Sequence, residues 1–216
     1  IAVLLTLLTV ILAFTCSSQK GDIMSILGAW EKGIWINNLL VFAYQMMLIL
    51  VLGHVLVLSK PANSLIDKLT SFVSSGTNAV VLVSFTTILV AFFNWGLGLI
   101  FGAILARKVA EHAQRNQISI NYPLVGAAGY SGLMVWHGGL SGSAPLDAAD
   151  TSKSLSSMLK GGNTIAGMPD YIPTSDTIFS WWNITIFIVI LIVIPLFLYF
   201  LSKRATPTTI NLPKYH

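Results

Sequence analysis

The chain alternates between long apolar stretches and short polar connections. A helix rises about 1.5 Å per residue and the hydrocarbon core of a bilayer is about 30 Å thick, so about 20 apolar residues cross it. The stretches at 36–58 and 181–201 are long enough for one crossing each, and residues 1–15 fit the second half of a clipped helix. The pattern therefore predicts an all-α, multi-pass membrane protein.

The apolar stretch at 80–106 is interrupted in its middle. The interruption contains Asn94, Trp95, Gly96 and Gly98. Glycine weakens a helix, and an asparagine followed closely by glycines is typical of a turn. The stretch is therefore either one slightly long helix or a re-entrant hairpin, which enters the membrane, turns at 94–98 and returns to the same side.

The stretch at 122–146 begins as a helix and ends in a run of glycine, serine and proline. We expect the helix to stop near His137, because glycines weaken a helix and Pro145 lacks an amide proton. From Pro123 to Trp136 the helix would cover only about 20 Å, which is less than the membrane core. This length favours a helix broken inside the membrane over a plain helix end at the interface that leads into a loop.

The placement of charge favours the hairpin over a single crossing at 80–106. A hairpin puts the loops at 59–79 and 107–121 and the tail after Leu201 on one side of the membrane. That side then holds eight basic and two acidic residues, which is a net charge of +6. The other side holds four basic and six acidic residues, which is a net charge of −2. Because cytoplasmic loops are enriched in Lys and Arg, the first side is expected to be cytoplasmic. The basic residues of that side are Lys60, Lys68, Arg107, Lys108, Arg115, Lys203, Arg204 and Lys214, and those of the other side are Lys20, Lys32, Lys153 and Lys160.

Composition supports the membrane assignment and narrows the classes of function. Of all residues, 55% are hydrophobic and only 9% are charged, whereas soluble domains carry about 25% charged residues. The net charge of +4 is spread over helix ends rather than gathered in a stripe, so we expect no nucleic-acid partner. The single Cys16 excludes an internal disulfide. The polar segment at 147–178 is interpreted as an outer loop without a metal-ligand spacing.

Three motifs resemble those of the short-chain fatty acid transporter family, which belongs to the ion transporter superfamily. They are the run at 136–146, which begins Trp-His-Gly-Gly, the turn at 93–98 and the approach to the last span at 172–179. The superfamily is built from two inverted repeats, each with a re-entrant hairpin and a broken helix. This chain, taken as one partial membrane domain over 1–216, resembles the first repeat.

The resemblance implies a secondary transporter that carries short-chain carboxylates, such as acetoacetate and butyrate, across the bacterial inner membrane. It also implies that the chain works with a second half of the transporter or with another copy of itself, as a homo-oligomer in the lipid bilayer. No cofactor is implied beyond a possible coupling ion, H⁺ or Na⁺. The alternatives are a permease for another small organic anion, an accessory subunit without transport, and a membrane enzyme using His54, His112 and His137.

The two interruptions contain groups that suit a small carboxylate. Free backbone amides, two serine hydroxyls and the Asn94 amide supply hydrogen-bond donors, and Trp95, Leu133 or Trp136 supplies an apolar wall. His137 could carry a proton or hydrogen-bond the broken backbone. We expect no catalytic or metal-binding residue. The predicted substrate-binding residues are Asn94, Trp95, Gly96, Gly98, Trp136, His137, Gly138, Gly139, Ser141, Gly142 and Ser143.

Overall fold

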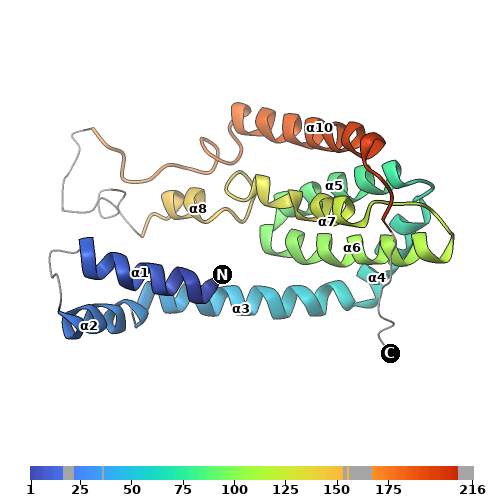
Figure 1. The fold of residues 1–216 in the computed structure, drawn as a ribbon. Coiled ribbons are helices and arrows are strands. Elements are labelled where there is room, and N and C mark those ends of the chain that lie inside the picture. Colours follow the sequence, from blue (N-terminus) through green and yellow to red (C-terminus); the bar gives the residue numbers. More distant parts are fainter. Residues whose placement is uncertain (17–21, 36, 153–154, 156–166, 209–216) are drawn as a thin grey trace. The chain divides into compact units, whose positions relative to one another are not determined.

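The computed structural model describes residues 1–16, 22–35, 37–152, 155 and 167–208, and within them it contains helices and no strands (Figure 1). Three helical segments are long and apolar enough to cross a membrane: Leu40–Leu58, Gly76–Phe93 and Trp181–Arg204. The prediction of an all-helical, multi-pass membrane protein is therefore confirmed. The α-helices are α1 (Ala2–Cys16), α2 (Ile23–Ile34), α3 (Asn37–Leu58), α4 (Lys60–Ser71), α5 (Gly76–Phe93), α6 (Trp95–Arg115), α7 (Tyr122–Tyr130), α8 (Ser143–Ala149) and α10 (Trp181–Arg204), and η1 (Ser131–Val135) is a 3₁₀-helix.

The chain forms two compact units, Ile1–Leu48 and Ile49–His216. The first unit contains α1, α2 and the beginning of α3, and its apolar side chains are largely exposed. Helix α2 begins at Asp22, whose side chain accepts a hydrogen bond from the Met24 amide at 3.1 Å. The second unit contains the buried core and both of the interruptions predicted from the sequence.

Helices α5 and α6 form an antiparallel hairpin that turns at Asn94 (Figure 1). Asn94 has extended backbone, ends α5 by donating its amide to Val90 O at 3.1 Å, and begins α6 by accepting from the Leu97 amide at 2.9 Å. Because an asparagine side chain can cap a helix, one residue ends the first helix and starts the second. The structure has a helical hairpin from Gly76 to Arg115, and its re-entrant placement in a membrane stays a prediction.

The hairpin packs closely against α7 and η1 through small residues. A Cβ atom built at Gly102 would meet the backbone of Gly129, and one at Gly132 would meet Thr87 and Ala91. Such small residues let helix backbones approach within van der Waals contact, which drives helix association in a membrane. The largest buried cluster lies around this contact and includes Val83, Leu105, Val109, Val125 and Ala128.

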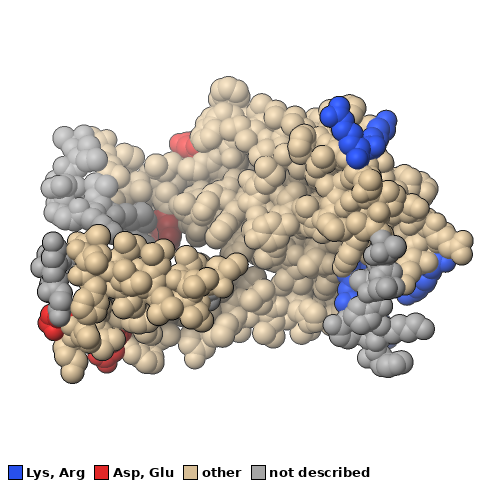
Figure 2. Space-filling model, in the orientation of Figure 1, with Lys and Arg blue, Asp and Glu red and all other residues tan. Residues whose placement is uncertain are grey.

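One end of the second unit gathers the start of α5, the start of α7 and the end of α10. Thr208 donates its amide to Ile120 O at 3.0 Å, and the Ser202 and Thr77 hydroxyls lie 3.3 Å apart. The loops at 59–79 and 107–121 and the described part of the tail, residues 202–208, therefore lie at the same end. Figure 2 shows Lys and Arg side chains gathered at this end. Of the charges used in the topology prediction, Lys20, Lys153, Lys160 and Lys214 lie outside the described residues.

This arrangement predicts that Ser64 and Asn116, both exposed, lie on the same side of the membrane. Single cysteines at these two positions, in a cysteine-free transporter that includes Cys16→Ser, should both react with an impermeant maleimide from the cytoplasm. Right-side-out and inverted vesicles give the measurement. Labelling of the two cysteines from opposite faces would contradict the hairpin.

Candidate functional site

The two interruptions of the chain lie against each other. The Trp95 amide at the hairpin turn donates to Ser141 Oγ at 3.0 Å. The Leu140 amide donates to Phe92 O, the last but one carbonyl of α5, at 2.7 Å. Two hydrogen bonds therefore join the turn of the hairpin to the segment that follows η1.

Aromatic rings cover this junction. The Trp95 and Trp136 rings stack with centroids 4.5 Å apart, and the His137 ring stacks on Trp136 at 5.0 Å. The indole nitrogen Nε1 of Trp136 is buried and donates to no acceptor among the described residues. A buried indole N–H usually has a partner, so this donor is a candidate for binding a polar ligand. The sequence indicated Trp136 only as an apolar wall.

The α-helical part of the broken helix ends earlier than expected. Helix α7 stops at Tyr130, η1 continues to Val135, and turns follow until α8 begins at Ser143. The expected stop near His137 corresponds to the end of η1 rather than to the end of α7. A 3₁₀-helix is narrower and longer per residue than an α-helix, and Gly132 of η1 lies directly against Thr87 and Ala91 of α5.

Only some backbone groups of the broken segment make hydrogen bonds within the turns of that segment. The Gly142 amide donates to Gly139 O at 3.1 Å, so this amide is not free as the sequence had suggested. The amides of Gly138 and Gly139 donate to no group among the described residues. These two neighbouring amides are therefore candidate donors at the junction, where Gly138 is half-buried and Gly139 is buried.

Asn183 in α10 holds the other side of the broken segment. Its Nδ2 donates to Gly138 O at 2.9 Å and to Ile178 O at 2.7 Å. Sequence reasoning did not include Asn183 in the site. The available signal was an amide side chain in the first turn of an otherwise apolar span, where an unpaired polar group is costly.

The remaining predicted residues divide into donors and packing positions. Ser141 Oγ accepts from Trp95 and so keeps its own proton for donation, and Asn94 uses Oδ1 for its cap while Nδ2 has no partner in the described part of the chain. Ser143 is exposed and makes no cap bond at the start of α8. Gly96 and Gly98 are buried packing positions, because a Cβ atom there would meet Ile49 and Ala91 respectively.

His137 lies beside a small hollow with a volume of about 290 Å³. The His137 side chain is exposed and stacks on Trp136, so the hollow beside it lies next to the aromatic stack. The hollow lies between the broken segment, α8 and the start of α10. Its other lining residues are Ala144, Pro145, Ala148, Thr177, Ile178, Trp182 and Asn183.

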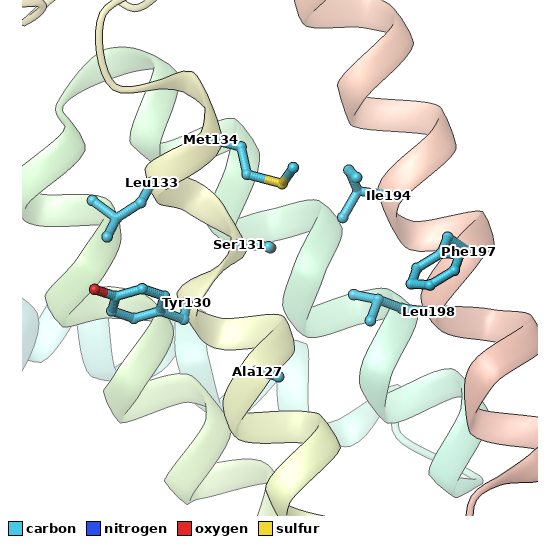
Figure 3. A pocket seen from close by; sticks show the side chains of 8 residues that line it. All are labelled: Ala127, Tyr130, Ser131, Leu133, Met134, Ile194, Phe197 and Leu198. Carbon is cyan, nitrogen blue, oxygen red and sulfur yellow. The ribbon is translucent and has the colours of Figure 1, made fainter.

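A larger apolar cleft of about 490 Å³ lies between α7, η1 and α10 (Figure 3). Leu133, predicted as part of an apolar wall, lines it together with Met134 and Ile194. The Ser131 hydroxyl in this cleft already donates to Ala128 O at 2.7 Å. The cleft therefore suits an apolar group better than a carboxylate.

Two discontinuous helical segments that meet inside a bundle of membrane helices define a class of membrane transporters. Residues 1–211 match the family described as "Short chain fatty acid transporter". The chain belongs to this family, which is one of transporters rather than enzymes.

Curated relatives carry the same description. The chain is 37% identical over 206 residues to a "Putative short-chain fatty acid transporter" of Escherichia coli (strain K12), covering 95% of this chain and 42% of the relative. It is 32% identical over 213 residues to a protein of the same name from Haemophilus influenzae (strain ATCC 51907 / DSM 11121 / KW20 / Rd). This match covers 99% of this chain and 45% of the relative. The chain thus spans less than half the length of these relatives. No solved structure matches it.

Proposed function

We propose that this chain forms the first half of a secondary transporter that carries short-chain carboxylates, such as acetoacetate and butyrate, across the bacterial inner membrane. The family match and the names of the two relatives support the substrate class. The observation that carries the proposal is the junction of the two interruptions, which the hydrogen bonds of the Trp95 and Leu140 amides hold together.

The junction offers neutral donors that would bind the substrate carboxylate. They are the amides of Gly138 and Gly139, the Ser141 hydroxyl, Asn94 Nδ2 and Trp136 Nε1. Neither interruption contains Lys or Arg. Hydrogen bonds between ions are stronger than those from neutral donors, so a neutral site binds an anion less tightly and releases it more easily. The stacked rings of Trp95 and Trp136 would contact the short acyl chain.

Transport would be coupled to H⁺ or Na⁺. His137 is the candidate proton carrier, because it is exposed, stacks on Trp136 and lies at the edge of the junction. The rest of the transporter, or another copy of this chain, would complete the surroundings of the site. Substrate sites of inverted-repeat transporters lie where the two repeats meet.

The proposal is tested by removing donors in the full-length transporter. Ser141→Ala removes a hydroxyl, and we expect the apparent affinity for butyrate or acetoacetate to fall by about ten- to a hundredfold, since a hydrogen bond to a charged group contributes about 1.5–3 kcal/mol. Asn94→Ala should have an effect of similar size. Uptake of labelled substrate into proteoliposomes gives the measurement.

Asn94→Asp separates binding from folding. Aspartate caps a helix as well as asparagine does, so the hairpin turn keeps its bond to Leu97 while the Nδ2 donor is replaced by an oxygen. We expect normal membrane abundance and a loss of uptake larger than that of Asn94→Ala, because the new charge repels the substrate. Ser131→Ala is the matched control, since this hydroxyl serves only its own helix. Unchanged apparent affinity in Ser141→Ala and Asn94→Asp would place the substrate elsewhere.

A further inference from the structure

A groove with a volume of about 800 Å³ lies between α5 and α10, away from the junction of the two interruptions. It begins at the basic end of the second unit and follows α5 toward its middle. Its apolar residues are Leu69, Val81, Leu82 and Phe85, and its polar residues are Ser75, Thr77, Asn78, Thr86, Tyr199 and Lys203.

Polar groups gather at one end of this groove. Lys203 lies in the last turn of α10, which the hydrogen bond between Ser202 and Thr77 holds beside the first turn of α5. Ser75 Oγ accepts from the Asn78 amide and keeps its own proton for donation. Among the described residues, this end of the groove therefore presents the Lys203 ammonium group and several neutral donors.

Lys203 has no carboxylate partner among the described residues. Its Nζ lies 4.4 Å from the centre of the Tyr199 ring, and the only ion pairs of the described part of the chain join Glu111 to Arg107 and Arg115. Figure 2 shows that other basic side chains share this end of the second unit. The polar end of the groove is therefore complementary to an anion.

The rest of the groove is complementary to an acyl chain. Val81, Leu82 and Phe85 form its wall, and the Thr86 hydroxyl at its far end donates back to Leu82 O at 2.7 Å. From Ser75 to Thr86 the helix rises by about 16 Å, which is about half of the hydrocarbon core of a bilayer. The groove thus has the depth of one membrane leaflet.

We propose that this groove binds an anionic phospholipid, with the phosphate at Lys203, Ser75 and Asn78 and an acyl chain along Val81, Leu82 and Phe85. A soluble phosphate or carboxylate would leave the apolar wall without a partner, and a zwitterionic lipid would bring its own cation to Lys203. Basic pockets at the ends of membrane helices bind lipid headgroups in this way. The bound lipid would bridge the base of the hairpin and the last span.

Native mass spectrometry of the full-length transporter, titrated with phosphatidylglycerol or phosphatidylcholine of the same acyl chains, tests this inference. We expect tighter binding of phosphatidylglycerol, and we expect Lys203→Gln to weaken it by on the order of fivefold. Lys203→Arg should keep the preference. The matched control is Arg204→Gln, which removes the same charge from the neighbouring residue outside the groove and should change the affinity by less than about twofold.

A second variant tests the apolar part. Val81→Phe narrows the groove. It should weaken the binding of both lipids by a similar factor and leave the preference for phosphatidylglycerol unchanged. Added glycerol 3-phosphate should not displace the bound lipid. Equal affinity for the two lipids, equal effects of Lys203→Gln and Arg204→Gln, or displacement by glycerol 3-phosphate would each overturn the inference. If the rest of the transporter covers this groove, neither lipid can enter it, and the two lipids should bind with equal affinity.

Discussion

Replacing Gly139 with alanine should reduce substrate uptake by about ten- to a hundredfold. Gly139 is buried, and a Cβ atom there would lie 2.5 Å from Phe92 O, the same oxygen that accepts the Leu140 amide. Backbone cannot move aside as a flexible side chain does, so the two interruptions would separate and the hydrogen bonds that join them would be strained. Overpacking of this kind costs about 1–3 kcal/mol, and each misplaced donor to a charged substrate costs a similar amount.

The neighbouring glycine provides the control for this effect. A Cβ atom at Gly138 would lie 3.0 Å from Oδ1 of Asn183, a side-chain atom that can shift by a few tenths of an ångström. Gly138→Ala also keeps the backbone amide. Labelled butyrate uptake, normalised to the amount of protein in the membrane, should therefore fall much less than for Gly139→Ala. Equal uptake by the two variants would show that the contact with Phe92 is not needed for transport.

The contact between α6 and α7 should show the largest effect on stability. A Cβ atom at Gly129 would lie 2.6 Å from Gly102 O, so Gly129→Ala forces the two helices apart. We expect a loss of about 2 kcal/mol, which corresponds to a fall of about 2 °C in the apparent Tm of a transporter more than twice as long as this chain. Thermal unfolding of the detergent-solubilised transporter, followed by size-exclusion chromatography, gives the measurement.

Gly126→Ala is the control on the same helix. No described residue has an atom within 4 Å of a Cβ atom built at Gly126. Alanine favours a helix over glycine by up to about 1 kcal/mol, so this variant should keep or raise the apparent Tm. If both variants lower it equally, helix propensity or lipid contact rather than the approach of Gly102 decides stability here.

Local sequence signals were sufficient to place most helices and both interruptions. Asn94 is at once a residue that ends α5 and a side chain that caps α6, and both roles depend on its immediate neighbours. The predicted spans at 36–58 and 181–201 correspond to the apolar segments Leu40–Leu58 and Trp181–Arg204. Hydrophobic length is set by consecutive residues, so it can be measured along the chain alone.

The state of each donor at the junction could not be predicted in the same way. Gly138, Gly139 and Gly142 look equivalent in the sequence, but the turn uses the amide of Gly142 alone. Ser141 and Ser143 are two residues apart, and only Ser141 accepts a bond from the hairpin turn. Which donor is free depends on the turn geometry and on a partner about 46 residues away.

The sequence by itself indicated a multi-pass membrane protein, its approximate spans and the two stretches in which helices are interrupted, because these follow from hydrophobic length and from the preferences of asparagine, glycine and proline. Only the tertiary structure decided that the breaks meet, that Trp136 carries a buried donor without a partner among the described residues, and that Asn183 holds the broken backbone. Each of these contacts joins segments far apart in the chain. Their pairing is set by the close approach of glycine-containing helix faces, which a one-dimensional pattern does not specify.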